Sequence, residues 1–409
     1  MPNDQDIKLC SIVKYAYSKS AFFRKKFDHA NIMPEDIKTV KDLKKIPPTG
    51  KMELITNQSE HPPFGEFLSV PINKIRRIYF SPGPIFEPQT DRDIENDTDV
   101  LKRGFQVCGV NPSDIVQVTF TYHLMPAGIR MHEAFEKMGC NVIPSGVGQT
   151  ELQLELMRKL HTTVYVGTPS FLGKIRDIAL QLNLNPNKDL SLRKGIFTAE
   201  PLPDSLRREL EEGFGLEAFN IYGIAEVGLV SQECEKHNGL HIHDEDLIVE
   251  VLDPYTLEPV EPGEQGELVL TTLNREAIPL IRYRTGDAVV IDISKCECGR
   301  KQPRMWIFGR VDMLTKVRGV FVYPKQVENI IKRYPELGGF QIIVDRPGRF
   351  DEMTVIAECK APIETIDKLS ETVATDLKNT LRLDVKVKFV KEGTIQKEVK
   401  ILDDRRKFS

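Results

Sequence analysis

Apolar positions follow a helical spacing over residues 6–60 of the chain. Ile12, Ala16 and Phe23 recur at intervals that place them on one face of a helix. Proline and glycine interrupt helices, so the helical region is expected to end near residues 47–50, which read Pro-Pro-Thr-Gly. The sequence therefore predicts a helical N-terminal region.

Residues 95–290 show a different pattern, in which short apolar runs alternate with stretches of helical spacing. Such alternation favours strands and helices arranged in parallel α/β layers. Strands are predicted at 114–120, 140–144 and 163–166, and helices at 129–138 and 151–160.

Residues 247–291 change character and predict a small β unit, because short apolar runs are joined by turn-rich links. Its strands are expected at 247–252, 266–271 and 288–291. After Gly309 the pattern restarts as a mixed α and β unit of about 100 residues, a size typical of a separate domain. The expected elements are a β pair around 314–322, helices at 324–333 and 363–381, and strands at 340–344, 353–359 and 385–390. The sequence thus predicts a domain over 1–308 and a mobile domain over 309–409.

The composition is that of an ordinary globular protein. Of the 409 residues, 40% are hydrophobic and 28% are charged, and the chain is too long for one ordinary core. A net charge of −4 provides no basic field, so we expect no nucleic-acid partner. We expect no membrane partner either, because the sequence shows no signal-peptide core and no apolar run of bilayer length. Seven cysteines in such a chain are not a disulfide framework, which favours a cytoplasmic location.

Candidate chemistry begins at residues 220–226, where an apolar run meets a turn. Gly223 lets the backbone approach a ligand closely, and Glu226 can hold a divalent cation on phosphate oxygens. The local string is equally that of a surface turn with a solvated glutamate.

Three further segments carry charged groups that could act on a ligand or at a pivot. Asp287 is expected at a strand end next to Gly286, where its carboxylate could accept two hydrogen bonds from ribose hydroxyls; an aspartate in a hairpin turn is the alternative. Asp312 and Lys316 lie where a linker could pivot, although a solvated hairpin explains that segment too. Lys397 could stabilise negative charge on a carboxylate or phosphate, or could simply be solvated.

A cysteine pair predicts a metal site. Cys296 and Cys298 stand one residue apart, and Cys234 and His241 lie upstream, so three thiolates and an imidazole could bind zinc tetrahedrally. His237 is the substitute for His241. Four protein ligands leave no open position, so such a zinc would be structural; two free thiols in a loop are the alternative.

Together these motifs resemble the adenylate-forming superfamily and, within it, the phenylacetate–coenzyme A ligase family. The likeness runs almost end to end and includes the segments 148–151, 167–170, 198–201, 267–271, 281–287 and 322–328. It implies an α/β adenylate-forming fold, with a large N-terminal α/β domain, a β unit and a small mobile α+β C-terminal domain.

The resemblance also implies roles for individual residues. Ala199, Glu200 and Pro201 would form the adenine segment, and Asn220 and Tyr222 would help to frame the adenine. Glu226 would bind Mg²⁺, Asp287 would hold the ribose, and Arg310, Ser81, Gly83 and Gly223 would contact the nucleotide. Asp312 would be the hinge, and Lys397 would be the adenylation lysine. Tyr122, His123, Ala127 and Gly128 would line the pocket for an aromatic acid.

The implied reaction has two steps. A carboxylate first attacks the α-phosphate of ATP to give an acyl adenylate and pyrophosphate, and the thiol of coenzyme A then displaces AMP after the C-terminal domain swings. Mg²⁺, coenzyme A and a structural zinc are the expected cofactors, a small carboxylic acid is the expected partner, and a homodimer is possible. Two alternatives remain open: a non-catalytic paralogue that binds AMP or acyl–coenzyme A as a sensor or subunit, and an adenylate-forming enzyme with another acceptor.

One segment departs from the family pattern. Residues 81–88 stand where the family has a phosphate loop, and only Ser81, Gly83 and Pro88 match it. Glu87 replaces the loop lysine, and it would repel a nearby triphosphate by roughly a few kcal/mol in a poorly solvated position. Near the C-terminus, Gln396 replaces the glycine that precedes the family's lysine.

Overall fold

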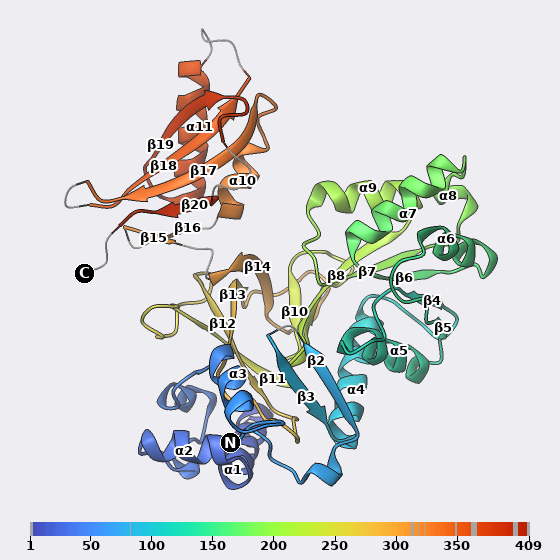
Figure 1. The fold of residues 1–409 in the computed structure, drawn as a ribbon, viewed down its shortest axis with the longest axis vertical. Coiled ribbons are helices and arrows are strands. Elements are labelled where there is room, and N and C mark those ends of the chain that lie inside the picture. The colour runs from blue at the N-terminus through green and yellow to red at the C-terminus, as the bar shows by residue number, and fades with distance from the viewer. Residues whose placement is uncertain are drawn as a thin grey trace.

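The computed structural model describes residues 3–406, apart from 82, 312–314, 319, 323, 348–349, 361–365 and 396–399. Figure 1 shows a large body that holds the N-terminal helices and an extended sheet, with a smaller unit beyond β14. No helix in the described part of the chain is long and apolar enough to cross a bilayer.

The predicted N-terminal helices are present, and their buried faces pack on the large sheet. Asn3 caps the first helix by accepting a hydrogen bond from the backbone N–H of Asp6. Leu9, Ile12 and Phe23 are buried in one core together with strands of residues 228–305. The elements are α1 (Asp4–Lys19), α2 (Ala21–His29), the 3₁₀ helices η1 (Pro34–Asp36) and η2 (Val40–Lys45), the short strand β1 (Thr49–Gly50) and α3 (Lys51–Glu60).

The predicted parallel α/β layer is confirmed. Its strands lie in the order β5-β4-β6-β7-β8, and every neighbouring pair is parallel. Helices cover the layer, and two buried apolar cores lie against it. The strands are β4 (Ile115–Val118), β5 (Asn141–Ile143), β6 (Val164–Gly167), β7 (Lys194–Phe197) and β8 (Glu217–Ile224); the helices are α4 (Asp91–Val107), α5 (Pro126–Met138), α6 (Thr150–Lys159), α7 (Pro169–Gln181), α8 (Pro186–Asp189) and α9 (Asp204–Phe214).

The predicted β unit is not separate from this layer, because β8 joins the two. It pairs in parallel with β7 and antiparallel with β9, and the sheet continues in the order β9-β10-β14-β13-β12-β11. These strands are β9 (Gly228–Gln232), β10 (Leu240–Ile242), β11 (Leu247–Leu252), β12 (Gln265–Thr272), β13 (Tyr283–Asp292) and β14 (Arg304–Arg310). Near the N-terminal helices, η3 (Ile72–Lys74) precedes a hairpin of β2 (Arg77–Ser81) and β3 (Ile85–Gln89).

The C-terminal residues form a unit with its own apolar core. Its main sheet has the order β19-β18-β17-β20, and β20 was not predicted from the sequence. Gly309 and Arg310, assigned to the C-terminal domain from the sequence, pair with β13 in the large sheet. The elements are β15 (Thr315–Val317), β16 (Val320–Val322), α10 (Pro324–Ile331), β17 (Leu337–Asp345), β18 (Glu352–Cys359), α11 (Ile366–Leu381), β19 (Val385–Lys391) and β20 (Leu402–Asp404).

Candidate functional site

The carboxylate of Asp287, on β13 of the large sheet, joins residues of β8 and β14. Asp287 accepts a hydrogen bond from the Tyr222 hydroxyl at 2.5 Å and from Arg310 at 3.1 Å. Arg310 also donates to the backbone carbonyl of Thr285 at 2.8 Å. Burial raises the pKa of Tyr222 well above its ordinary value, so the phenol stays protonated and donates to Asp287.

The expectation that Asp287 stands at a strand end is wrong, because it lies inside β13 opposite Arg310 on β14. Gly286 permits this arrangement: its φ is +73°, and the strand continues through it. A Cβ at 286 would lie 2.4 Å from the Arg310 guanidinium, so a side chain there would displace the arginine. Glycine thus lets the arginine fold back over the strand onto Asp287.

Glu226 lies in the turn between β8 and β9, with its side chain only 6% exposed. Its carboxylate accepts a hydrogen bond from the Tyr283 hydroxyl at 3.0 Å and forms an ion pair with Lys51 at 2.9 Å. The alternative of a solvated surface glutamate is therefore wrong. Gly223 allows the turn to close, because a Cβ there would lie 2.6 Å from the backbone oxygen of Gly228.

Lys51 and Tyr283 were not predicted as site residues. They meet because Thr49 and Gly50 of β1 pair in parallel with Tyr283 and Arg284, which puts the next residue, Lys51, beside the site. No local pattern signals this, since the two strands are far apart in the sequence. Lys51 also reaches the β2–β3 hairpin: a Cβ on Gly83 would lie 3.4 Å from its Cε.

The predicted adenine segment follows β7 at the same edge of the parallel layer. Ala199 has a left-handed backbone, with φ of +69°. Glu200 accepts a hydrogen bond from the backbone N–H of Ser170 at 3.4 Å, which joins the segments after β6 and β7. Asn220 lies opposite Phe197 in the pairing of β8 with β7. Carboxyl ends of parallel strands are where open α/β sheets bind ligands, and Pro201 lies in this connection too.

The β2–β3 hairpin, where the resemblance predicts a phosphate loop, is bound to α3 through Phe86. Phe86 exchanges two backbone hydrogen bonds with the Gln58 side chain, at 2.8 and 2.9 Å. The strand alternation turns Phe86 outward and Glu87 inward. Ser81 is buried at the end of β2, and Gly83 is in the turn.

The sequence predicts repulsion between Glu87 and a nearby triphosphate, but its carboxylate faces the interior. It is 7% exposed, and its nearest cation is Arg130 at 3.6 Å. Burial raises the pKa of Glu87, and the positive charge of Arg130 opposes that shift.

The residues predicted for the acid pocket cluster around the start of α5. The Tyr122 hydroxyl lies 3.2 Å from Nδ1 of His132, while His123 is exposed. Ala127 packs against a buried core. Gly128 is tightly packed, because a Cβ there would lie 2.3 Å from the backbone oxygen of Thr121. Whether these residues bind an acid stays a prediction.

The predicted zinc ligands come together. The ligand atoms of Cys234, His241, Cys296 and Cys298 all lie within 4.8 Å of one another. The Cys298 sulfur lies 3.4 Å from Nε2 of His241, whose Nδ1 is 3.3 Å from the backbone oxygen of Gln302. Three sulfurs and one nitrogen at such separations fit a tetrahedral zinc site. Each sulfur would be held as a thiolate, the form that binds the metal.

His237, the substitute ligand, is engaged elsewhere. Its ring nitrogens lie 3.4 Å from Glu233 and 3.3 Å from Glu217. The predicted hinge Asp312 and the predicted adenylation lysine Lys397 lie outside the described residues. Lys316, the alternative pivot, is in β15.

Comparison with known proteins first defines the class. Residues 105–274 match the family model described as AMP-binding enzyme, and residues 319–405 match the model described as AMP-binding enzyme C-terminal domain. A solved open conformation of 2-hydroxyisobutyryl-CoA ligase superposes with a TM-score of 0.90 at 23% identity, covering 98% of this chain and 90% of that one. The fold is therefore that of the adenylate-forming enzymes.

Curated relatives then define the family. The chain is 35% identical to phenylacetate–coenzyme A ligase of Thermus thermophilus, over 88% of this chain and 81% of the relative. It is 33% identical to the Aromatoleum evansii enzyme of that name, over 97% and 92%, and 35% identical to that of Escherichia coli, over 85% and 80%. The chain belongs to the phenylacetate–coenzyme A ligase family.

Proposed function

We propose that this protein is an ATP-dependent acid–thiol ligase that adenylates an aromatic carboxylic acid and transfers the acyl group to coenzyme A. The observation that carries the proposal is the network of Tyr222, Asp287 and Arg310, in which Asp287 lies on the same strand, β13, as the Tyr283 that donates to Glu226. Family membership supports the reaction class, and the relatives' names support an aryl acid.

In this proposal the chain's own groups bind and orient the nucleotide. Asp287, held by Tyr222 and Arg310, accepts hydrogen bonds from the ribose hydroxyls. Glu226 would hold Mg²⁺, which when bound neutralises charge on the phosphate oxygens. Lys397 would stabilise charge at the α-phosphate during adenylation.

The domain division at 308/309 stays part of the proposal, with Asp312 as the hinge about which the two surfaces exchange. Tyr122, His123, Ala127 and Gly128 would contact the acid. We further propose a cytoplasmic location without nucleic-acid or membrane partners, with homodimerisation possible.

The test is pyrophosphate release with a panel of aryl and alkyl acids, followed by detection of the coenzyme A thioester. We expect both products with an aryl acid. Pyrophosphate release without a thioester would indicate another acceptor. No release with any acid at millimolar ATP, together with AMP binding, would indicate a non-catalytic paralogue instead.

We also propose that Cys234, His241, Cys296 and Cys298 bind one structural zinc. Replacing Cys296 and Cys298 with serine should abolish zinc content and lower stability by about 2–3 kcal/mol, the linkage expected for a ligand near a hundredfold its dissociation constant. Elemental analysis and thermal melting measure the two effects. Cys359→Ser, outside the cluster, is the control; equal melting temperatures and no zinc in the wild type would refute the site.

Lys51 is expected to contact the triphosphate, because it lies between Glu226 and the hairpin turn. Lys51→Met should remove a partly exposed cation worth about 1 kcal/mol, which raises KM for ATP about fivefold. AMP affinity should not change, since AMP lacks the β- and γ-phosphates. Titrations of ATP and AMP measure the two affinities. The control is Lys25→Met, which removes a surface ion pair with Glu66. An equal loss of AMP binding would contradict the assignment.

A further inference from the structure

Two buried arginines hold the backbone on either side of Glu226. Arg130 of α5 donates to the carbonyl of Ala225 at 2.9 Å. Arg275, in the connection after β12, donates to the carbonyl of Val227 at 2.7 Å. The two carbonyls flank the glutamate, so the arginines fix the turn from which its side chain projects.

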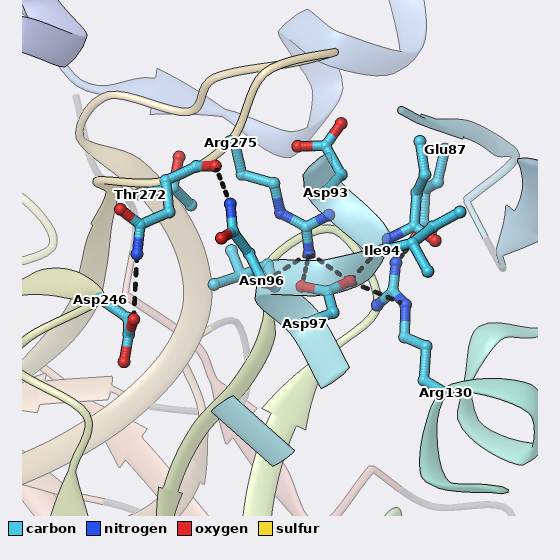
Figure 2. Close-up of polar contacts among 12 residues, drawn as sticks. Glu87, Asp93, Ile94, Asn96, Asp97, Arg130, Asp246, Thr272 and Arg275 are labelled. Carbon is cyan, nitrogen blue, oxygen red and sulfur yellow. Dashed lines mark hydrogen bonds and ion pairs between the residues drawn. The ribbon is translucent and has the colours of Figure 1, made fainter. Parts of the chain in front are cut away.

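Both arginines are joined through one carboxylate, Asp97 of α4. Arg130 Nε lies 3.1 Å from one oxygen of Asp97, and Arg275 Nη2 lies 2.8 Å from the other. Figure 2 shows both guanidinium groups directed at Asp97, that of Arg275 from above and that of Arg130 from the right. Gln89 donates a further hydrogen bond to Asp97 at 2.6 Å. A single side chain thus sets the separation of the two arginines.

Glu87 completes the charge balance of this cluster. Arg130, Arg275, Asp97 and Glu87 carry two positive and two negative charges, and all four side chains are about nine-tenths buried. Glu87 is paired with Arg130 at 3.6 Å, although neither oxygen of its carboxylate has a hydrogen-bond partner among the described residues, so the buried charges compensate each other through the ion pair. A lysine at position 87 would replace this carboxylate with a third cation beside Arg130 and Arg275. Glu87 therefore lies where two buried arginines favour a carboxylate.

The cluster borders the space into which Glu226 projects. Glu87, Arg130, Arg275 and Glu226 line one pocket together with Phe86 of the hairpin. The Arg130 guanidinium also lies 5.1 Å from the centre of the Tyr79 ring on β2, which adds a cation–π contact between α5 and the hairpin. Residues from α4, α5, β2 and β3 therefore converge on the turn of Glu226.

We propose that four positioning residues hold Glu226 for magnesium-dependent nucleotide binding: Glu87, Asp97, Arg130 and Arg275. Glu87 belongs to this cluster and does not bind phosphate. The inference rests on the proposed nucleotide role of Glu226. The β2–β3 hairpin then has a structural role, because its Glu87 pairs with Arg130. This ion pair helps to fix the position of the Glu226 carboxylate, which would bind Mg²⁺.

Arg130→Lys tests the proposal, because it keeps the charge but removes the planar fork that contacts Asp97, Ala225 and Glu87 from three different nitrogens. ATP binding is titrated calorimetrically at a series of Mg²⁺ concentrations. We expect the Mg²⁺ concentration for half-maximal ATP binding to rise about fivefold or more, with AMP affinity changed less than twofold. A change in Mg²⁺ requirement below twofold would overturn the proposal.

Arg304→Lys is the matched control. Arg304 is also buried and contacts a carboxylate, that of Asp292, and the backbone carbonyls of Asn238 and Ser294, but none of these contacts involves the turn of Glu226. It should leave the Mg²⁺ requirement unchanged. If Arg130→Lys fails to fold, the double variant Glu87→Gln/Arg130→Gln removes the pair without leaving an unbalanced charge, and the same rise is expected.

The wild-type protein separates this inference from the proposed function. Magnesium-dependent ATP binding without pyrophosphate release would refute the ligase reaction and still allow the variants to be compared by binding. Pyrophosphate release with unchanged Mg²⁺ requirement in both variants would leave the ligase standing and refute the positioning role. Wild-type ATP binding that is independent of Mg²⁺ would refute the positioning role as well.

Discussion

Glu226→Gln should lower kcat for pyrophosphate release by about 10²–10³-fold, the usual loss when one group that stabilises transition-state charge is removed. The amide keeps the size of the side chain and can still accept a hydrogen bond from Tyr283, but it has lost the negative charge that would hold Mg²⁺. Lys51 would also lose its partner at 2.9 Å. The measurement is steady-state pyrophosphate release at saturating ATP and acid.

Excess Mg²⁺ should recover part of this activity, because the variant is impaired in holding the cation rather than in folding. Glu250→Gln is the control, since Glu250 is also a largely buried glutamate in an ion pair, in its case with Arg282 at 3.0 Å. Equal kcat for Glu226→Gln and the wild type would contradict a magnesium role for Glu226.

Asp287→Asn should raise KM for ATP and weaken AMP binding by about 10–100-fold. A hydrogen bond to a charged group contributes about 1.5–3 kcal/mol, and about 1.4 kcal/mol corresponds to a tenfold change in affinity. The amide presents one acceptor oxygen where the carboxylate has two, and those two are contacted by Tyr222 and Arg310. Calorimetric titration of AMP measures the loss without the need for turnover.

Strand β13 itself supplies the control for this experiment. Asp292 pairs with Arg304 across β13 and β14 as Asp287 pairs with Arg310, five positions further along the strand. Asp292→Asn makes the same chemical change and should leave AMP affinity unaltered. An equal loss in both variants would show that the effect comes from the sheet and not from the ribose site.

The layer architecture could be predicted because its signals are local. The strand and helix patterns of residues 114–166 appear as β4, α5, β5, α6 and β6, each within a few residues of the expected bounds. The cysteine cluster could also be predicted, although Cys234 and Cys296 are distant in the sequence, because thiol and imidazole ligands are rare enough to be matched by type.

The rest depends on contacts that no local pattern encodes. Arg130 looks like a surface residue of an amphipathic helix until β3 places Glu87 against it. Asp287 was expected at a strand end because glycine usually interrupts strands, whereas pairing with β12 and β14 carries β13 through Gly286. Strand β20 was missed because its three residues form a strand only by pairing with β17.

The short strand β1 ties the start of the chain to a strand made much later. The Thr49 hydroxyl donates to the carbonyl of Ile281, 232 residues away, and β1 pairs with β13 directly before Lys51. During synthesis, the pairing of β1 with β13 can therefore form only after most of the large unit has left the ribosome. Contacts of such sequence separation form slowly and leave apolar surface exposed meanwhile. The nucleotide site should thus be among the last parts of the molecule to fold. Until then, the exposed apolar faces of the N-terminal helices would be the surface that chaperones bind.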